Sequence, residues 1–449
     1  MTEQVHTTAV EVRDVVKSFG GVLALDRVSL ELRTGEVHAL LGENGAGKTT
    51  LSNILAGIYR EESGQVIVGG AERHFHNPAQ AIEAGVGMVH EHFRLVNSMS
   101  VAENLHLGSP DTPRVVSNRS LVASARRMMD EIGLHVDPEA KIWQLSVGEQ
   151  QRVEILRVLA RGARVLILDE PTAVLTAKEA RELFVVMRRL AEGGRTVVFI
   201  SHKLNEVLEV SDRITVLRGG KHVITRDAEG ATARELARLM TGEEVGIDVA
   251  HREVTGAEVL ALDKVCARNS RGVEALDGVS FSVRSGEILG VAGVSGNGQT
   301  ELAEVVTGLR ATSSGSISVD GTDVTNTTSR RITDLGVGHI PEDRIGVGMV
   351  ASAPLKDNAV LRHYRDGVLS TKRLLKRDRV VEFAREMVEV GRVQTRSVHM
   401  PAGQLSGGNQ QRLVARRESM LAHRLLVAAH PTRGLDVLAA KQVQQAIIE

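Results

Sequence analysis

Residues 42–49 read GENGAGKT and match the pattern G-x-x-x-x-G-K-[ST]. They follow the apolar run VHALL at 37–41 and lead into TTLSNILAG at 49–57, whose apolar spacing is helical. Glycines permit positive φ, so successive backbone N–H groups of such a loop can turn toward phosphate oxygens. Lys48 supplies a positive charge for the β- and γ-phosphates, and Thr49 a hydroxyl for Mg²⁺. The stretch predicts a strand–loop–helix phosphate site; the alternative is a glycine-rich turn that matches the pattern by chance.

The composition narrows the class of protein. In 449 residues, 55 Lys and Arg are balanced by 56 Asp and Glu, and aromatic residues make up only 2%. The chain has neither an excess of basic residues nor the aromatic residues on which bases would stack, so no nucleic-acid partner is expected. No apolar run approaches the roughly 18 residues of a membrane span, and the opening MTEQVHTTAV has no secretory signal. The single Cys266 excludes a disulfide framework. The chain is expected to be cytosolic and soluble.

The sequence repeats itself over long distances. Residues 28–70 align without a gap to residues 279–321, at an offset of 251. Further along, LSVGEQQR from Leu145 matches LSGGNQQR from Leu405 at an offset of 260. A repeat this long indicates two copies of a whole domain and not a solenoid of short units.

The first copy is expected to span residues 10–240 and the second 259–449, with the polar, Gly-containing stretch 241–258 as the linker. The second copy reaches Glu449 before the counterpart of TVVFIS at 196–201. By comparison with the first half, the chain is expected to lack roughly its last 50 residues. A fragment and a naturally shortened chain remain equally open.

Two carboxylates follow a second apolar run of the first copy. VLILD at 165–169 and TVVFIS lack polar alternation, as expected for parallel strands covered on both faces, and they predict an α/β fold. Asp169 and Glu170 stand at the carboxyl end of VLILD, where ligands bind in open α/β sheets. Asp169 is predicted to hold Mg²⁺ and Glu170 to orient or deprotonate an attacking water, while His202 is placed to touch the γ-phosphate. Without the nearby P-loop, two exposed carboxylates would be the simpler interpretation.

Taken in order, the P-loop, LSVGEQQR at 145–152, DEPT at 169–172 and SHK at 201–203 resemble the ATP-binding cassette (ABC) ATPases across nearly the whole chain. The resemblance implies two tandem P-loop domains, each with a RecA-like parallel-sheet core, an antiparallel β subdomain and an α-helical subdomain. It also implies head-to-tail packing of the two, with each ATP and its Mg²⁺ between one P-loop and the other domain's signature segment, and with Phe19 against adenine. The nucleotide-binding residues that it implies are Gly42, Glu43, Asn44, Gly45, Ala46, Gly47, Lys48, Thr49, Thr50, Ser406, Gly407 and Gly408.

The second copy departs from the pattern at matching places. Its P-loop, GVSGNGQT at 293–300, has Gln299 in place of the lysine, and Ala429 and His430 replace the two carboxylates. In the implied pairing this poor P-loop faces LSVGE, where Val147 replaces a glycine, and the intact P-loop faces LSGGN. One hydrolytic site per chain is therefore predicted, because the second lacks a base and binds nucleotide at most. The residues of this degenerate second site would be Gly293, Gly298, Gln299, Thr300, Ser146 and Gly148.

Two positions of the first copy depart from the family. Relatives usually carry Gln where Glu91 stands in MVHEHF, and a carboxylate there could approach Mg²⁺ while adding negative charge near the phosphates. The predicted metal ligands are accordingly Thr49, Asp169 and Glu91. Many relatives carry, where Thr176 stands, an Asp that links the two sites. Both departures bear on coupling more than on nucleotide binding.

The tandem arrangement resembles the fused ATPase subunits of bacterial importers for simple sugars and nucleosides. Such a subunit lies on the cytoplasmic face of the cell membrane, docks on two integral-membrane permease subunits, and receives solute through an extracytoplasmic binding lipoprotein. Sugar-type subunits tend to carry Arg where Gln299 stands, and GNGQTEL, MVHEHF, IPEDRIGVGMV and LLVAAHPTRGLD are similar to nucleoside-type subunits. Nucleosides are thus the expected solute, and simple sugars the alternative. A translation factor acting on ribosomes is a further alternative, disfavoured by the short linker and poor second P-loop; a purely regulatory nucleotide-binding module is another.

Overall fold

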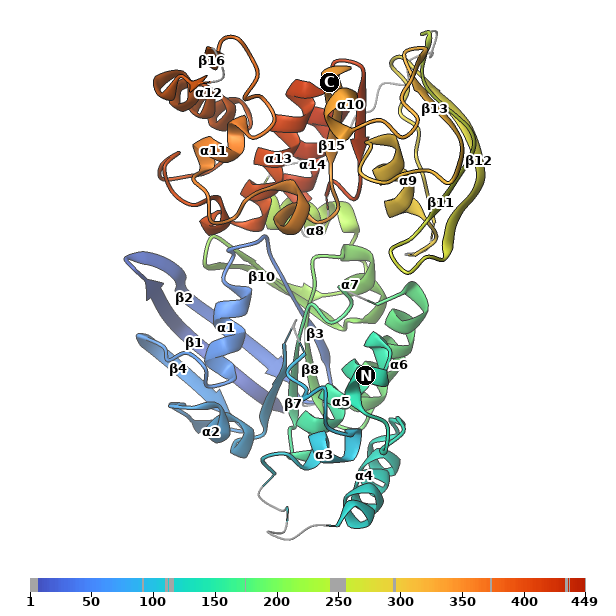
Figure 1. The fold of residues 1–449 in the computed structure, drawn as a ribbon. Helices are drawn as coiled ribbons and strands as arrows, with labels where there is room; N and C mark the ends of the chain where they lie inside the picture. Colours follow the sequence, from blue (N-terminus) through green and yellow to red (C-terminus); the bar gives the residue numbers. More distant parts are fainter. Residues whose placement is uncertain are drawn as a thin grey trace. The chain divides into compact units, whose positions relative to one another are not determined.

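The computed structural model describes residues 7–90, 93–109, 112, 117–173, 175–242, 256–293, 296–371, 374–432, 435 and 437–448. It divides into two compact units, Met1–Val245 (unit 1) and Gly246–Glu449 (unit 2), whose elements are labelled in Figure 1. Each unit combines strands with helices. In the part of the chain that the structure describes, no helix is long and apolar enough to cross a membrane.

Unit 1 begins with an antiparallel sheet of strand order β2-β1-β4-β5. Its strands are β1 (Thr8–Phe19), β2 (Val22–Arg33), β4 (Ser63–Val68) and β5 (Ala71–Glu72). Alternate residues at the end of β2 are buried, so one face of the β1–β2 hairpin joins the hydrophobic core. This sheet is the antiparallel β subdomain that the sequence implied.

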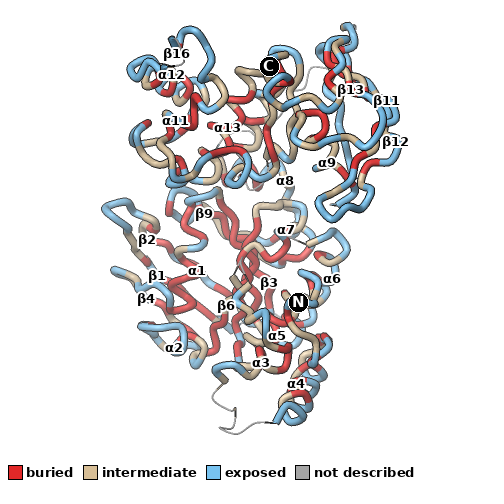
Figure 2. Tube along the Cα trace, viewed as in Figure 1, coloured by how far each residue is buried: buried red, intermediate tan, exposed pale blue. Residues whose placement is uncertain are grey.

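The second sheet of unit 1 has the order β10-β9-β3-β8-β7-β6, and all its neighbouring strands are parallel except the edge pair β10–β9. The strands are β3 (Val37–Leu41), β6 (Val86–Val89), β7 (Val165–Asp169), β8 (Thr196–Ile200), β9 (Arg213–Arg218) and β10 (Lys221–Asp227). Every residue of β3, β7 and β8 is buried, as the chain trace in Figure 2 shows for the centre of this unit. The prediction of parallel strands covered on both faces is confirmed for VLILD and TVVFI.

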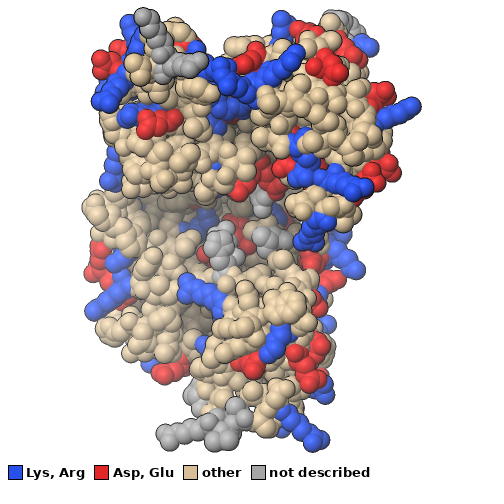
Figure 3. All heavy atoms as spheres, viewed as in Figure 1, with Lys and Arg blue, Asp and Glu red and all other residues tan. Residues whose placement is uncertain are grey.

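Helices flank the parallel sheet of unit 1. They are α1 (Lys48–Leu55), α2 (Pro78–Glu83), α3 (Val101–His106), α4 (Asn118–Ile132), α5 (Val147–Ala160), α6 (Ala177–Glu192), α7 (Leu204–Val210) and α8 (Ala233–Thr241), with a 3₁₀ turn at Ile142–Gln144. Of these, α3, α4 and α5 pack against one another and form a separate helical layer, while α6 contacts β3 and β8. On the face of unit 1 drawn in Figure 3, basic and acidic side chains are interspersed, in keeping with the balanced composition.

Unit 2 repeats this arrangement along the chain. Its antiparallel sheet, of order β12-β11-β13-β14, is built from β11 (Glu258–Arg268), β12 (Glu274–Arg284), β13 (Ser314–Val319) and β14 (Thr322–Asp323). A parallel pair, β15 (Val337–Ile340) and β18 (Leu425–Ala428), follows, and a small hairpin joins β16 (Ser370–Thr371) to β17 (Leu374–Leu375). The helices are α9 (Gln299–Val306), α10 (Ser329–Asp334), α11 (Leu355–Val360), α12 (Arg377–Val390), α13 (Gly407–Leu421) and α14 (Val437–Ile448), with single turns at Arg344–Gly348 and Ala402–Gln404.

The parallel core predicted for each copy forms a sheet in unit 1, whereas the described residues of unit 2 contain one parallel pair of strands, β15 and β18. In unit 1, the strand before the P-loop, β3, lies between β8 and β9. Residues 288–292, ILGVA, hold the same place before the second P-loop but form no strand, and Ile288 is 65% exposed. Among the described residues of unit 2, this segment pairs with no strand.

Candidate phosphate-binding and catalytic site

The P-loop of unit 1 joins β3 to α1, as predicted. Gly47 is the N-cap of α1 and has φ of 102°, a conformation that glycine adopts without the cost a side chain would bring. A Cβ at Gly47 would lie 2.8 Å from the carbonyl oxygen of Ala24, and one at Gly42 would lie 2.5 Å from that of Leu217. Both glycines are therefore required by backbone packing around the loop, and the loop's path across the end of β3 is set by its own sequence.

Lys48 lies inside the curve of this loop. Its side chain is 8% exposed, and Nζ donates hydrogen bonds to the carbonyl oxygens of Gly42, at 2.7 Å, and Glu43, at 3.0 Å. The ammonium group is thus held at the mouth of a backbone nest, where it can interact with phosphate oxygens. Thr49, the next residue, is exposed at the first turn of α1.

The two predicted carboxylates lie where β7 ends. Asp169 is the last residue of β7, is 8% exposed and pairs with Ile200 of β8. Glu170 has φ of 48°, an uncommon conformation for a residue with a side chain, and such backbone strain concentrates at functional sites. The strand order places Glu170 beside the end of β8, because its backbone N–H donates to the carbonyl oxygen of Ile200 at 3.0 Å.

His202 and Glu170 form a close pair. The Nδ1 atom of His202 lies 3.0 Å from Oε1 of Glu170, although 32 residues separate them. The hydrogen bond to Glu170 raises the pKa of His202 above its ordinary value, despite an opposing effect of burial. Glu170, a carboxylate that can accept a proton, therefore lies beside the imidazole of His202, whose pKa is raised. Both are at the end of the sheet that carries the P-loop.

The oxygen donors near the P-loop have the chemistry that Mg²⁺ prefers. A buried carboxylate, Asp169, and an exposed hydroxyl, Thr49, are hard oxygen ligands of the kind found for Mg²⁺ bound to phosphates. The third predicted ligand, Glu91, lies outside the described residues.

Phe19 has an aromatic neighbour that the sequence did not reveal. It lies at the end of β1, is 44% exposed, and its ring meets that of Tyr59 edge to face with centroids 5.2 Å apart. Lys17 Nζ lies 5.4 Å from the centre of the Phe19 ring. Tyr59 follows α1 by four residues, so only the folding of the β1–β2 hairpin toward the end of α1 brings the two rings together. The one signal in the sequence that could have drawn attention to this pair is the rarity of aromatic residues, which make up 2% of the chain.

The signature segments of both copies begin helices. Ser146 is the N-cap of α5, and its hydroxyl accepts from the backbone N–H of Glu149; Ser406 is the N-cap of α13, and its hydroxyl accepts from Nδ2 of Asn409 at 2.9 Å. A Cβ at Gly148 would lie 2.8 Å from a carboxylate oxygen of Glu179 of α6, so α5 and α6 pack closely there. Around Gly408 the nearest atom to such a Cβ, in Ala439, is 3.8 Å away.

Thr176, where relatives carry an Asp, is the N-cap of α6. Its hydroxyl accepts from the backbone N–H of Glu179, whose carboxylate in turn accepts from the backbone N–H of Thr176 at 2.9 Å. Because Asp and Thr are both good N-cap residues, the departure preserves the start of the helix.

The second P-loop keeps the glycine cap of the first but differs in chemistry. Gly298 caps α9 with φ of 96°, and a Cβ there would lie 2.5 Å from the carbonyl oxygen of Ala275, as in the first copy. The amide of Gln299 lies against Gly293, since a Cβ added there would be 2.2 Å from Nε2. Thr300 is exposed, as Thr49 is. The cap that starts the helix is retained, but Gln299 brings no positive charge.

The degenerate strand end also keeps its conformation. His430 has φ of 46°, close to the 48° of Glu170, so the turn survives where the carboxylate does not. The structure thus brings together the P-loop and the Glu170–His202 pair within unit 1. The predicted pairing of each P-loop with the signature segment of the other copy is a relation between the two units and stays a prediction.

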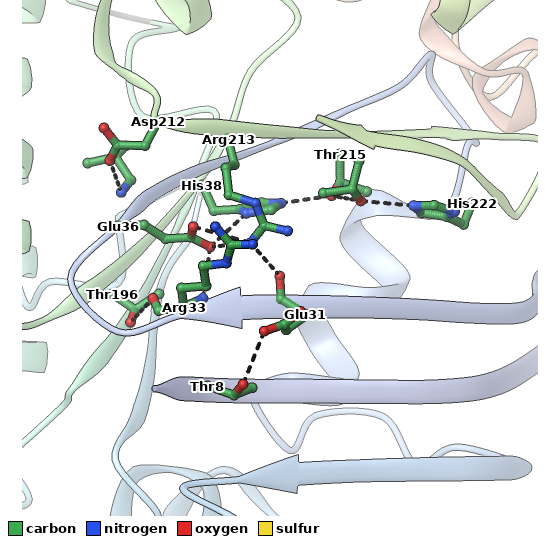
Figure 4. A network of polar contacts seen from close by, with 12 residues as sticks. Thr8, Glu31, Arg33, Glu36, His38, Thr196, Asp212, Arg213, Thr215 and His222 are labelled. Atoms are coloured by element: carbon green, nitrogen blue, oxygen red, sulfur yellow. Dashed lines mark hydrogen bonds and ion pairs between the residues drawn. The ribbon is translucent and has the colours of Figure 1, made fainter. Parts of the chain in front are cut away.

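A buried polar network lies under the strand that leads to the P-loop (Figure 4). His38, in β3, has no exposed surface; its Nδ1 lies 2.9 Å from Oε1 of Glu36, and its Nε2 lies 2.8 Å from the hydroxyl of Thr215 in β9. Arg213 approaches the other oxygen of Glu36 at 3.3 Å. Burial acts to raise the pKa of Glu36, but the hydrogen bond and charge of His38, the backbone N–H of Arg33 and the charge of Arg213 together outweigh it, so this pKa lies below its ordinary value.

Replacing Glu36 with Gln is therefore expected to destabilise the protein by about 1–3 kcal/mol at pH 7, since it removes charge-assisted hydrogen bonds at a buried site. A lowered folded-state pKa means that the carboxylate stabilises fully above its unfolded pKa of about 4.3 and loses this contribution as the pH falls through the folded value. Urea unfolding at pH 7, 5 and 3 measures this, with the exposed Glu31→Gln as the control. A difference between Glu36→Gln and the unmodified chain that persists undiminished below pH 4 would contradict it.

Comparison with known families gives two matches along the chain. Residues 25–173 and residues 276–433 each match the family described as ABC transporter. The chain belongs to the ABC transporter family. Both matches include a P-loop and a signature segment, so this ABC protein carries two copies of the family's ATP-binding domain, as the internal repeat predicted.

Curated relatives match nearly the whole ABC chain. The guanosine import ATP-binding protein NupO of Bacillus subtilis is 44% identical over 98% of this chain and 87% of its own length. The nucleoside import ATP-binding protein NupA of Lactococcus lactis is 42% identical over 99% of this chain and 88% of its own length. The glucose import ATP-binding protein TsgD13 of Haloferax volcanii is 42% identical over 97% of this chain and 85% of its own length.

Proposed function

We propose that this chain is an ATP-hydrolysing subunit that powers the import of nucleosides across a membrane. Two of the relatives reported above are named for guanosine or nucleoside import, and both align over nearly all of this chain. In this proposal the chain sits on the cytoplasmic face of the membrane and docks on two permease subunits. An extracytoplasmic lipoprotein delivers the solute, and no nucleic acid takes part.

The observation that carries the catalytic part is the Glu170–His202 pair beside an intact P-loop. Glu170 is placed to orient the attacking water and accept its proton, and His202, held at 3.0 Å, fixes that carboxylate and contacts the γ-phosphate. Lys48 neutralises phosphate charge from inside the loop. Ser406, Gly407 and Gly408 would complete the site from the second copy, where the Ser406 N-cap starts α13 and offers backbone N–H groups to an anion.

The metal-binding part of the proposal assigns Mg²⁺ to Thr49, Asp169 and Glu91. When bound, Mg²⁺ supplies positive charge that offsets the negative charge on the phosphates during transfer. Asp169 ends β7, where pairing with Ile200 of β8 fixes its backbone on the sheet.

The second P-loop is proposed to bind nucleotide at most. Replacing Gln299 with Ala is expected to change steady-state ATP hydrolysis less than threefold, because a neutral amide contributes no charge and Ala429-His430 offers no carboxylate base. Phosphate release by the purified chain at saturating ATP measures the effect. A loss greater than tenfold would show that the second site is needed for closure, and the one-site model would then be wrong.

A second candidate, import of simple sugars, has one specific observation in its favour. The relative named for glucose import is 42% identical to this chain, the same as NupA. Identity over the ATP-binding subunit therefore does not separate the two solutes, whereas Gln299, where sugar-type subunits tend to have Arg, favours nucleosides.

A pull-down tests the import proposal directly. The chain would be tagged in its native host, the membranes solubilised gently, and the co-purifying proteins identified by mass spectrometry. We expect multi-span permease subunits together with a lipoprotein, and we expect the isolated lipoprotein to bind guanosine or another nucleoside. A lipoprotein that binds glucose or ribose and no nucleoside would support the sugar candidate, and recovery of ribosomal proteins alone would overturn the import proposal.

A further inference from the structure

The turn that presents Glu170 is held by a residue outside the predicted site. Glu170 has φ of 48°, and the backbone N–H of Ala173 donates to the carbonyl oxygen of Glu170 at 3.2 Å, which closes a tight turn. Thr172 lies within that turn and has no exposed surface. Thr172 is therefore a buried part of the same turn that presents Glu170.

Thr172 forms hydrogen bonds through both its side chain and its backbone. Its hydroxyl donates to Oε2 of Glu206 at 2.5 Å, and its carbonyl oxygen accepts from Nζ of Lys203 at 2.9 Å. The same Nζ lies 2.9 Å from Oε1 of Glu206, so the three groups close on one another. All three of these contacts involve a charged group, and such hydrogen bonds are stronger than neutral ones.

These partners come from the segment that carries His202. Lys203 follows His202 directly, and Glu206 lies in the first turn of α7. The contacts therefore tie the Glu170 turn to the His202 segment at a second place, in addition to the 3.0 Å contact between Glu170 and His202 themselves.

The second copy has the same turn conformation. His430, the counterpart of Glu170, has φ of 46°, close to the 48° of Glu170. The left-handed conformation therefore does not require a carboxylate at this position, and it does not by itself account for the contacts of Thr172.

We propose that Thr172, Lys203 and Glu206 are positioning residues that hold the Glu170 carboxylate in register with His202 for ATP hydrolysis. This rests on the proposed ATPase function of the same site. None of the three touches the reacting atoms. They act through the geometry of the pair, and displacement of a catalytic group by about 1 Å can cost on the order of 100-fold in rate.

The test compares variants that keep or lose the tie. Thr172→Val preserves shape and removes the hydroxyl, and we expect kcat for ATP hydrolysis to fall by about 10- to 100-fold with KM and ATP affinity changed less than about threefold. Thr172→Ser retains a hydroxyl and is expected to recover most of the rate. Glu206→Ala is expected to behave like Thr172→Val, and Glu209→Ala, an exposed position on the same helix, is the matched control. A Thr172→Val chain that turns over within threefold of the unmodified one would overturn the proposal.

The double variant Thr172→Val/Glu206→Ala separates a shared role from two independent ones. If the residues act as one unit, its kcat is within about twofold of the slower single variant; if the two losses multiply, the proposal is wrong.

Hydrogen exchange gives a readout that does not depend on turnover. We expect faster amide exchange in residues 201–210 of Thr172→Val and Glu206→Ala, and unchanged exchange in Glu209→Ala, because only the first two release this segment from the turn. Unchanged exchange in Thr172→Val would overturn the tie even if no hydrolysis were measurable. An unmodified chain that binds and hydrolyses no ATP, yet shows the expected exchange pattern, would refute the proposed function and leave the structural tie in place.

Discussion

A chain in which Glu170 is replaced by Gln is expected to lose steady-state ATP hydrolysis by about 10²–10⁴-fold while binding ATP within about threefold of the unmodified affinity. The amide retains the size of the carboxylate and an oxygen that can accept from Nδ1 of His202, which lies 3.0 Å from Glu170 Oε1 in the unmodified chain. It cannot take a proton from water. Phosphate release measures the rate, and titration with a fluorescent ATP analogue measures the affinity.

The control for Glu170→Gln is His430→Gln. His430 occupies the counterpart position with nearly the same φ, so this change tests the effect of a glutamine on the turn itself. We expect it to leave hydrolysis within threefold. Comparable turnover by Glu170→Gln and the unmodified chain would show that the one-site model is wrong. The described residues of unit 2 offer no carboxylate at the matching strand end, so Glu170 is the base that this model requires.

The second large effect is expected from Lys48→Met. Methionine retains most of the buried stem of Lys48 but removes the ammonium group, which the loop holds where it can bond phosphate oxygens. Each hydrogen bond to a charged group contributes about 1.5–3 kcal/mol, and about 1.4 kcal/mol of binding free energy corresponds to a tenfold change in Kd. ATP affinity should therefore fall by about 10- to 100-fold, with hydrolysis lost at ordinary ATP concentrations.

Equilibrium titration of Lys48→Met against the unmodified chain checks this. Gln299→Ala supplies the matched comparison, because it alters the same position of the second P-loop, where no positive charge is present. An affinity of Lys48→Met within twofold of the unmodified value would show that the phosphates bind elsewhere. A loss in Gln299→Ala as large as that in Lys48→Met would show that the second copy binds most of the nucleotide.

Much of the fold could be predicted because its signals are local. VHALL, VLILD and TVVFI are buried strands, as their unbroken apolar runs predicted, and the spacing of the internal repeat anticipated a second domain with the same order of elements. Residues 288–292 are the exception. They have the apolar character of β3 but form no strand, because strand formation depends on neighbours that come from elsewhere in the chain.

The site was predictable where a single turn of chain carries the chemistry. Gly42, Gly47 and Lys48 occupy the positions that the P-loop pattern requires, and Asp169 ends its strand. The contacts that organise these groups were not predictable. Tyr59 beside Phe19 joins residues 40 apart, and Thr172 beside Glu206 joins residues 34 apart, with no regular spacing to reveal either pair.

The sequence by itself determined the phosphate loop, the carboxylates at a strand end, the duplication and the loss of charge in the second copy. The loop and the carboxylates are short runs of adjacent residues, and the duplication and the loss of charge follow from comparing two such runs. Only the tertiary structure decided that Glu170 meets His202 and that Lys203 and Glu206 hold the turn between them. The physical reason is the strand order β3-β8-β7: burial of apolar strands on both faces selects which strand ends become neighbours, and that selection depends on the packing of the whole sheet.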